Sequence, residues 1–472
     1  MTYPTHQPHH HLSDPFLTVQ GGTALSGETL VPGAKNAALP AIVAACLSEQ
    51  PTVLHNVPTG LNDVELLISL LRSLNVEIEE PEPGTLICSG RNWQNSALNG
   101  NQVGRLRHSL LLLGAAAHRH TRLLLPLPGG CKLGSRRHDL HLLALRSLGF
   151  SVAETQAGIE LGSQNLTRDE QGKDTRISFH YPTFGGTLNV LFAASGCEGT
   201  TYLENAAVNP EVLDVIALLS SMGADITWVG EATLRIRGAK LHGTEHTVMS
   251  DRIITSTLVA ATAVTKGHTF IKGATTEVLK AEAAAWRSAG LVLEEASDGV
   301  EVRALEPLQA VSIRTKAYPG FHTDIQPLHA AMMLQAEGEA LIEETILDGR
   351  FRYAQELKKL GASLDIEDAD FLCVNGAPGQ RLRIRGVKKL HGAQVQATDI
   401  RGGAAVVVAA LAAEGTTRVT NLYQLERGYT DIGALLSPLG AQVERVGERS
   451  AASIGKANSA GAASSAVEAK SD

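Results

Sequence analysis

The sequence has few of the features that mark secreted, zinc-binding or membrane proteins. Its five cysteines are an odd number and no two have CxxC spacing, so neither a disulfide scaffold nor a structural zinc site is expected. No basic segment followed by an apolar one stands near residue 1, and the longest apolar run, 404–413, is too short to cross a bilayer. These absences favour a cytoplasmic protein. The four cysteines in apolar contexts are expected to be small buried side chains; they are Cys46, Cys88, Cys197 and Cys373.

Positive charge is not in excess either. The chain has 41 Lys and Arg against 49 Asp and Glu, which gives a formal net charge of −8. Proteins that bind nucleic acids or membrane surfaces usually carry net positive charge, so neither partner is expected. A local basic pocket is compatible with this balance.

The two ends differ in composition from the rest of the chain. Residues 1–15 are rich in histidine ("HQPHHHL"), which indicates a flexible, solvated segment, with metal binding as the alternative. Residues 447–472 are rich in Ala, Ser and Gly and have few apolar anchors, so this tail is expected to be disordered. The folded part is therefore expected to span residues 16–446.

Six segments of the chain follow one plan. "EGTTYLENAAVNPEVLDVIALLSSMGADI" and "EGTTRVTNLYQLERGYTDIGALLSPLGAQVE" each contain a turn, a short alternating strand, a loop, an amphipathic helix and a second strand. The six copies begin at Glu49, His118, Glu198, Lys266, Glu337 and Glu414. Their spacing of about 70 to 80 residues indicates an internal repeat.

A helix of small apolar residues precedes most copies, for example "AALPAIVAACLSE" and "AAVVVAALAAE". Such segments are apolar nearly all round, so they should be buried. We therefore predict two similar α/β domains, each of three βαβαββ-type units with sheets around buried helices. Domain one would comprise residues 16–35 and 249–446, and domain two residues 36–248. A solenoid is the alternative, although the unit is large for one. A cleft between two such domains would be the place for a ligand.

Several polar residues stand out because the repeat does not need them, and most precede a buried helix. They are Lys35, Asn36, Arg107, Cys131, Arg136, Asp139, His141, Asp324, Arg350, Asp399, Arg401 and Arg427. Cations do not stabilise a helix N-terminus, but together with its free N–H groups they can bind an anion. Any one of them is compatible with an ordinary solvated charge. Together they predict a cationic pocket for a small substrate with carboxylate or phosphate groups.

These motifs, taken together, resemble those of the enolpyruvyl transferases. The matching stretches are "PGAKNAALP", "LPGGCKLGSRRHDLH", "ENAAVNPEVLD", "TDIQ", "DGRF", "TDIR" and "RGY", within residues 19–446. The branch that uses uridine nucleotides is nearer than the shikimate 3-phosphate branch, which lacks the cysteine loop. The resemblance implies an inside-out α/β barrel in each domain. It also implies transfer of enolpyruvyl from phosphoenolpyruvate to a sugar hydroxyl of a uridine nucleotide, by a monomer without metal or cofactor.

The resemblance further implies roles for individual residues. Cys131 corresponds to the loop cysteine that protonates C3 of the donor and is alkylated by fosfomycin. Asp324 corresponds to the carboxylate proposed as the base at the acceptor hydroxyl. Lys35, Arg136 and Arg427 correspond to donor ligands, and Lys35 and Arg427 complete the implied catalytic set. The implied substrate-binding set is Asn36, Arg107, Arg136, Arg137, His138, Asp139, Thr183, Phe184, Gly185, Arg350 and Arg401.

The sequence departs from the family pattern where the acceptor would bind. Arg137 replaces a proline that helps to hold the uracil ring, and His138 follows it. Tyr181 replaces a lysine along the diphosphate, and Phe184 is bulky for its position. Three interpretations stay open. The acceptor is UDP-N-acetylglucosamine, in the first committed step of peptidoglycan synthesis; or it is another nucleotide, such as UMP in nucleoside-antibiotic biosynthesis; or the chain is a non-enzymatic homologue.

Overall fold

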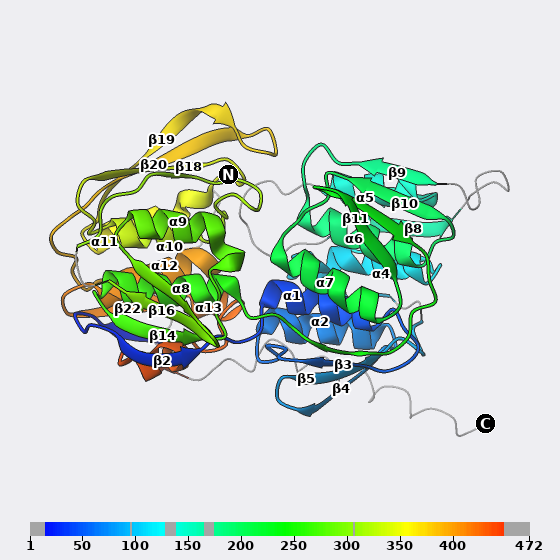
Figure 1. Cartoon of the computed structure of the whole chain (residues 1–472), viewed down its shortest axis with the longest axis horizontal. Coiled ribbons are helices and arrows are strands. Elements are labelled where there is room, and N and C mark those ends of the chain that lie inside the picture. Colours follow the sequence, from blue (N-terminus) through cyan, green and yellow to red (C-terminus); the bar gives the residue numbers. More distant parts are fainter. Residues whose placement is uncertain (1–14, 95–96, 128–137, 165–173, 305–306, 448–472) are drawn as a thin grey trace, which may run out of the picture.

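The chain forms two bodies that lie side by side, each around its own hydrophobic core (Figure 1). The computed structural model describes residues 15–94, 97–127, 138–164, 174–304 and 307–447. The first core is built from residues 34–248, and the second from residues 17–31 and 253–441. The histidine-rich segment up to residue 14, the tail from residue 448, and Cys131, Arg136 and Arg137 lie outside the described residues.

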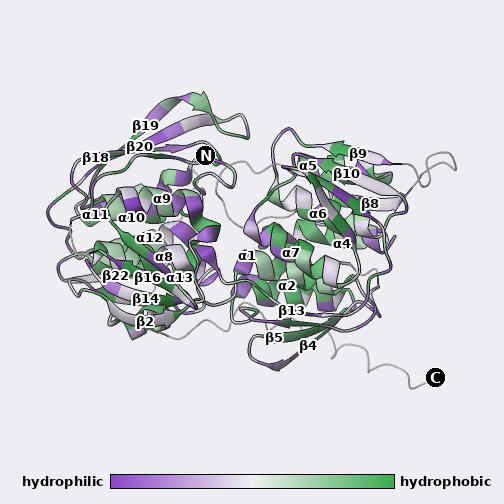
Figure 2. Ribbon diagram, viewed as in Figure 1, coloured by the Kyte–Doolittle hydropathy of each residue, from purple (hydrophilic) through white to green (hydrophobic). Residues whose placement is uncertain are grey.

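Buried helices occupy the centre of each body. They are α1 (Lys35–Ala45), α4 (Leu111–His118) and α6 (Phe184–Ser195) in the first body, and α8 (Arg252–Val264), α10 (Gln326–Met333) and α12 (Ile400–Leu411) in the second. Their side chains are almost all buried, as predicted, and Figure 2 shows hydrophobic residues concentrated along them. Small residues let these helices approach closely. A Cβ at Gly114 of α4 would lie 2.5 Å from Oδ1 of Asn189 on α6, so this crossing requires glycine.

Six sheets surround the central helices. In the first body their orders are β13-β3-β5-β4, β6-β8-β7 and β11-β12-β10-β9. The strands are β3 (Thr52–His55), β4 (Glu77–Glu82), β5 (Thr85–Ser89), β6 (Leu123–Leu125), β7 (Phe150–Thr155), β8 (Gly158–Gln164), β9 (Thr175–Ser178), β10 (Thr200–Glu204), β11 (Asp225–Gly230), β12 (Thr233–Arg237) and β13 (Glu245–Thr247).

The second body repeats this plan with the orders β15-β16-β14-β2, β17-β18-β20-β19 and β21-β22-β1-β23. Its strands are β1 (Phe16–Gln20), β2 (Ser26–Leu30), β14 (His268–Lys272), β15 (Val292–Ala296), β16 (Gly299–Arg303), β17 (Ile313–Arg314), β18 (Glu339–Glu344), β19 (Ser363–Leu372), β20 (Pro378–Arg385), β21 (Gln394–Gln396), β22 (Thr416–Thr420) and β23 (Gln442–Val446). Each four-stranded sheet has one parallel pair and two antiparallel pairs. Two closed groups of units are observed, so the solenoid alternative is wrong.

The remaining helices complete the units. They are α2 (Asn62–Ser73), α3 (Gly100–Val103), α5 (Asp139–Ser147), α7 (Pro210–Ser221), α9 (Lys280–Ser288), α11 (Ala354–Lys359), α13 (Leu422–Glu426) and α14 (Ile432–Leu436), with the 3-10 turns η1 (Arg107–Leu110), η2 (Glu277–Leu279), η3 (Arg350–Tyr353) and η4 (Ser437–Leu439). None of the helices in the described part of the chain has the length and apolar character needed to span a membrane. The four cysteines expected to be buried are buried.

The chain passes between the bodies at two adjacent segments, 31–34 and 248–251. Gly33 and Ser250 form an antiparallel bridge, the N–H of Ala34 donates to the carbonyl of Met249 over 2.7 Å, and that of Asp251 donates to Pro32 over 2.9 Å. Glycine is required at residue 33 because a Cβ would lie 1.7 Å from the carbonyl oxygen of Asn56. The two crossings are therefore held together as one joint, while the exact domain boundaries stay a prediction.

Candidate functional site

A cavity of about 440 Å³ lies between the two bodies, and the N-terminal ends of all six central helices open onto it. The lining residues at or just before these ends are Lys35, Asn36, Arg107, His108, Thr183, Phe184, Gly185, Arg252, Asp324, Asp399, Ile400 and Arg401. Helix N-termini carry partial positive charge and unpaired N–H groups. The repeat thus directs six such ends at one space, which favours an anionic ligand there.

One side of the cavity carries a buried cluster of Lys35, Asp63 and Arg427, here called the Lys35 cluster. Asp63, in the first turn of α2, lies between the two cations: Lys35 Nζ donates to its Oδ2 over 3.2 Å, and Arg427 Nε donates to its Oδ1 over 3.1 Å. Each side chain is only 6% exposed. Two cations around one carboxylate leave a net charge of +1, which an anionic ligand can neutralise.

The charges of the Lys35 cluster shift the pKa values of its members. Burial lowers the pKa of Lys35, with Arg401 and Arg427 acting in the same direction and Asp63 opposing it. Burial alone would raise the pKa of Asp63, but Lys35 and Arg427 outweigh it and hold that pKa below its usual value. Asp63 therefore stays an anion. A bound anion beside Lys35 would stabilise its protonated form, so ligand binding and protonation reinforce each other.

A second cluster, the Asp324 cluster, consists of Asp324, Arg350, Asp399 and Arg401. Oδ1 of Asp324 accepts from Arg350 Nη2 over 3.3 Å, and its Oδ2 accepts from Arg401 Nε over 3.4 Å. The fully buried Arg350 also donates to Asp399 Oδ1 over 3.1 Å, and Asp399 caps α12 by accepting from two N–H groups of its first turn. Two carboxylates here balance two guanidinium groups, and the arginines orient the carboxylate of Asp324.

The N-terminus of α6 forms a neutral wall on the first body. Thr183 caps the helix by accepting from the N–H of Gly186, and the N–H groups of Phe184 and Gly185 have no carbonyl within the helix to bond. A Cβ at Gly185 would lie 2.7 Å from the ring of His141, so glycine permits this close approach. Nδ1 of His141 accepts from Asn189 over 2.8 Å. Burial, aided by Arg107, lowers the pKa of His141 to about 3, so the ring is neutral at pH 7.

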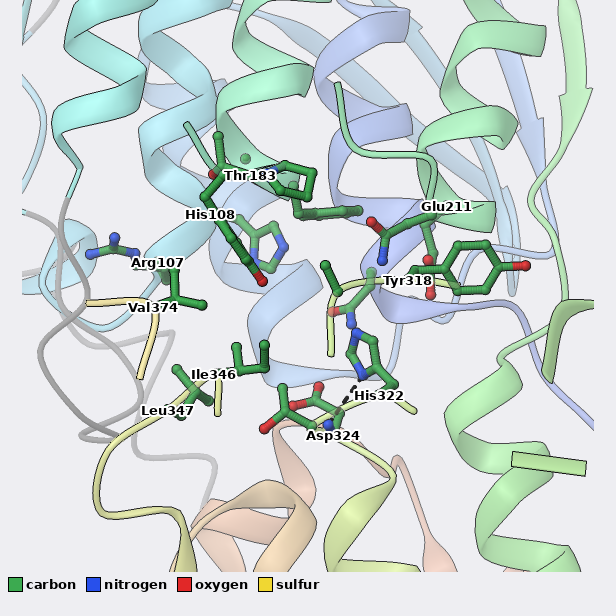
Figure 3. A pocket seen from close by; sticks show the side chains of 18 of the residues that line it. Arg107, His108, Thr183, Glu211, Tyr318, His322, Asp324, Ile346, Leu347 and Val374 are labelled. Atoms are coloured by element: carbon green, nitrogen blue, oxygen red, sulfur yellow. Dashed lines mark hydrogen bonds between the residues drawn. The ribbon is translucent and has the colours of Figure 1, made fainter. Parts of the chain in front are cut away.

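His322 lies in the wall beside Asp324 (Figure 3). Its Nδ1 accepts a hydrogen bond from the backbone N–H of Asp324 over 3.1 Å. Burial, followed by the neighbouring Arg252, lowers the pKa of His322 to about 3. The ring is therefore neutral at pH 7, and its proton is on Nε2.

Three pairs of side chains join the two bodies around the cavity. Arg427 bonds Asp63 as described, Arg252 Nε donates to Glu211 Oε1 over 2.8 Å, and Arg105 Nη2 donates to the hydroxyl of Tyr423 over 3.0 Å. The pair of Arg252 and Glu211 is fully buried, whereas that of Arg105 and Tyr423 is near the surface. The cavity therefore lies between two bodies that are in direct contact.

The structure brings together all but one of the described residues predicted for the site. Those that line the cavity are Lys35, Asn36, Arg107, Asp139, Thr183, Phe184, Gly185, Asp324, Arg350, Arg401 and Arg427. The exception is His138, which does not line it and whose Nε2 lies 2.9 Å from Oε2 of Glu154. Cys131, Arg136 and Arg137 fall outside the described residues, so their predicted roles stay predictions.

Other cavity residues were not predicted from the sequence. They include Asp63, His108, Glu211, Arg252, Tyr318 and His322. Arg252 occupies the same place at the start of a central helix as Lys35 and Arg401, so the repeat could have identified it. Glu211 belongs to the stretch "ENAAVNPEVLD", one of the motifs that resemble those of the enolpyruvyl transferases, but no role was predicted for Glu211.

A family model and curated proteins both match nearly the whole folded part of this chain. Residues 19–436 match the family model described as EPSP synthase (3-phosphoshikimate 1-carboxyvinyltransferase). UDP-N-acetylglucosamine 1-carboxyvinyltransferase 1 of Staphylococcus aureus (strain MRSA252) is 36% identical over 435 residues, covering 92% of this chain and 99% of that protein. The enzyme of the same name from Halalkalibacterium halodurans is 37% identical over 436 residues, covering 92% and 94%.

Solved structures show the same fold. The enolpyruvyl transferase NikO from Streptomyces tendae has a TM-score of 0.78 at 26% identity, covering 93% of this chain and 100% of that one. EPSP synthase from Acinetobacter baumannii has a TM-score of 0.69 at 18% identity, covering 92% and 100%, and supports the fold alone. The predicted two-domain inside-out α/β fold is thereby confirmed. Because the family model spans nearly the whole folded part of the chain, this protein belongs to the EPSP synthase family and is an enolpyruvyl transferase.

Proposed function

We propose that the protein transfers the enolpyruvyl group of phosphoenolpyruvate to the 3-hydroxyl of UDP-N-acetylglucosamine and releases phosphate, which is the first committed step of peptidoglycan synthesis. The observation that carries this proposal is the cavity between the two bodies, in which a net positive cluster and the carboxylate of Asp324 line the same space. The 36% identity to the Staphylococcus aureus enzyme of that specificity supports the acceptor.

The donor binds at the Lys35 cluster in this proposal. Phosphoenolpyruvate carries a phosphate and a carboxylate, and Lys35 and Arg427 supply cations already held in place by Asp63. Charge that develops in an enclosed, preorganised site is stabilised more strongly than in water. Arg136 is assigned to the same anion on the sequence motif.

The reaction needs an acid and a base. Cys131 donates a proton to C3 of phosphoenolpyruvate, which makes C2 electron-deficient, and the acceptor oxygen then forms a bond to C2. Asp324 takes the proton from the acceptor hydroxyl, since Arg350 and Arg401 orient its carboxylate. Phosphate next leaves with the electron pair of its bond to C2 and takes up the proton held by Asp324. C3 returns one proton to the thiolate of Cys131, which restores the double bond and the thiol.

The acceptor binds along the neutral wall. The unpaired N–H groups of Phe184 and Gly185, at the positive end of α6, can donate to its phosphate oxygens. Asn36 lies at the start of α1 beside the donor cluster and is assigned to the acceptor sugar. Arg107 and Asp139 line the cavity on the same body and complete this assignment.

A second candidate acceptor is a smaller nucleotide such as UMP. Tyr181 stands where the family pattern has a lysine, and burial, with a smaller effect of Glu344, raises the pKa of its phenol to about 12. The side chain is therefore uncharged at pH 7 and supplies no cation for a diphosphate. The likeness to the Streptomyces tendae enolpyruvyl transferase is compatible with either acceptor.

Phosphate release tests both candidates. The protein would be incubated with phosphoenolpyruvate and either UDP-N-acetylglucosamine or UMP, with phosphoenolpyruvate alone as the control. We expect release with UDP-N-acetylglucosamine that depends on the acceptor. Release with UMP alone would replace the first candidate by the second, and no release with either nucleotide would contradict both.

A further inference from the structure

One hairpin of the second body is longer than its counterparts in the other repeat units. In the described residues, the hairpins β4–β5, β7–β8, β11–β12 and β15–β16 are each closed by two residues, at 83–84, 156–157, 231–232 and 297–298. The hairpin β19–β20 is closed by the five residues 373–377. Its strands have 10 and 8 residues, while no strand of the other four exceeds 7. The repeat itself does not need this extension.

The turn of the long hairpin reaches the cavity. Val374 and Asn375 line it, together with Ile346 and Leu347 of the segment that follows β18. Figure 1 shows the hairpin, in yellow, along the top of the second body with its closed end toward the first. Figure 3 shows Val374, Ile346 and Leu347 on the side of the cavity away from Glu211 and Tyr318.

Hydrogen bonds fix the turn in this position. The N–H of Val374 donates to the carbonyl of Thr345 over 3.0 Å, and Nδ2 of Asn375 donates to Oδ1 of Asp348 over 2.5 Å. Oδ1 of Asn375 also accepts from the N–H of Ala377 over 3.1 Å, which closes the turn. The extension is thus attached at two points to the segment that leads to Arg350, and forms a built part of the wall.

The chemistry of this wall differs from that of the charged clusters. Val374, Ile346 and Leu347 bring three apolar side chains together at one part of the wall, whereas the Lys35 and Asp324 clusters place charged groups at other parts. Phosphoenolpyruvate is a small anion and gains little from apolar surface. A sugar or base ring gains from it, because such surface excludes water while one or two polar groups orient the ring. Tyr181 lines the same cavity as Val374 and Asn375, so this wall shares that space with the segment assigned to the acceptor.

We infer that the turn of the β19–β20 hairpin, through Val374 and Asn375, is a specificity-determining element that contacts the uncharged ring portion of the acceptor nucleotide and does not bind the donor. The inference rests on the proposed function in one respect, namely that the acceptor is a uridine nucleotide. The hairpin extension would then be how one unit of the repeat was adapted to a particular acceptor.

Substitutions at two positions of the same hairpin test the inference. Val374→Trp puts a bulky ring into the wall, whereas Leu372→Trp makes the same addition at a side chain that is 67% exposed and does not line the cavity. We expect Val374→Trp to raise KM for the acceptor by about tenfold or more and to change KM for phosphoenolpyruvate by less than about twofold. Leu372→Trp should match the wild type. Val374→Ala, which carries little risk to folding, should raise KM for the acceptor by about threefold.

Three outcomes separate this inference from the proposed function. If the wild type uses either nucleotide and both Val374 variants keep its acceptor KM, the inference is overturned and the proposed function stands. An equal rise in both KM values overturns it as well. If the wild type turns over neither nucleotide, the proposed function fails by itself; the inference is then decided by equilibrium binding of UMP, whose Kd Val374→Trp must raise and Leu372→Trp must not.

Discussion

The Lys35 cluster and the Asp324 cluster line the same cavity and are both buried, yet their charges balance differently. In the first, one carboxylate lies between two cations; in the second, two carboxylates face two arginines. An uncompensated cation attracts an anionic ligand, whereas a balanced cluster holds its members in place. Under the proposed function, the first cluster binds the donor anion and the second positions the carboxylate that acts on the acceptor.

The two clusters also differ in where their members come from. Lys35 and Asp63 belong to the first body and Arg427 to the second, so the Lys35 cluster exists only when the bodies meet. All four members of the Asp324 cluster belong to the second body. In the proposed function, donor binding is therefore coupled to contact between the bodies, while Asp324 is oriented within one of them.

Loss of the Asp324 carboxylate should have the largest effect. We expect Asp324→Asn to lower kcat by about 10³-fold, or about 4 kcal/mol, because the acceptor hydroxyl loses its base. KM for phosphoenolpyruvate should change little, since the Lys35 cluster is intact. Steady-state kinetics with both substrates measures this. Lys35→Met is the matched comparison and should raise KM for phosphoenolpyruvate; the same pattern from both variants would contradict the separation of roles.

Loss of the Asp63 carboxylate should reduce the stability of the fold as well as the reaction rate. Asp63→Asn leaves Lys35 and Arg427 buried beside each other without their shared carboxylate, and we expect a loss of about 3 kcal/mol in the free energy of unfolding. Inorganic phosphate should raise the Tm of this variant more than that of the wild type, because it replaces the missing negative charge. Asp225→Asn, which breaks a surface pair with Arg235, serves as the control and should leave stability close to the wild type. An equal response to phosphate in wild type and Asp63→Asn would argue against an anion site at this cluster.

The smallest predicted effect concerns His141, in the neutral wall at the N-terminus of α6, and the pH dependence of stability. Because the pKa of folded His141 is about 3 and its ordinary value is 6.5, the unfolded chain binds the extra proton between these values, and stability falls as pH drops through that window. Between about pH 7.5 and about pH 5 this one histidine should cost about 2 kcal/mol. His141→Asn keeps an acceptor for Asn189 and should remove that part of the loss in urea titrations. His242→Asn, at an exposed position, should leave the pH dependence unchanged, and an unchanged dependence in His141→Asn would refute the assignment.

Much of the fold and part of the site could be predicted from the sequence. The central helices were identifiable because they are apolar all round, and Lys35 and Arg401 because a cation at the start of such a helix does not stabilise it. Asp63 escaped prediction because an acid in the first turn of an amphipathic helix is ordinary. Its role depends on Arg427, which is 364 positions away in the chain.

His138 illustrates the opposite error. The motif places it next to Asp139, but α5 begins between them, so the two side chains leave the backbone in different directions. Asp139 lines the cavity, whereas His138 pairs with Glu154 on β7. Proximity in sequence does not determine which side of a helix start a residue occupies. The role of the long hairpin was equally hidden, because its turn reaches the cavity through tertiary contacts with residues 345–348.

The paired crossings at residues 31–34 and 248–251 have a mechanical consequence. Two backbone segments bonded side by side act as a pivot, so any rotation of one body against the other displaces an atom in proportion to its distance from that joint. Lys35 directly follows one crossing and has a short lever arm. The turn of the β19–β20 hairpin lies farther from the joint, at the upper end of the region between the two bodies (Figure 1), and has a longer one. A small angular movement would therefore displace this turn more than it displaces Lys35.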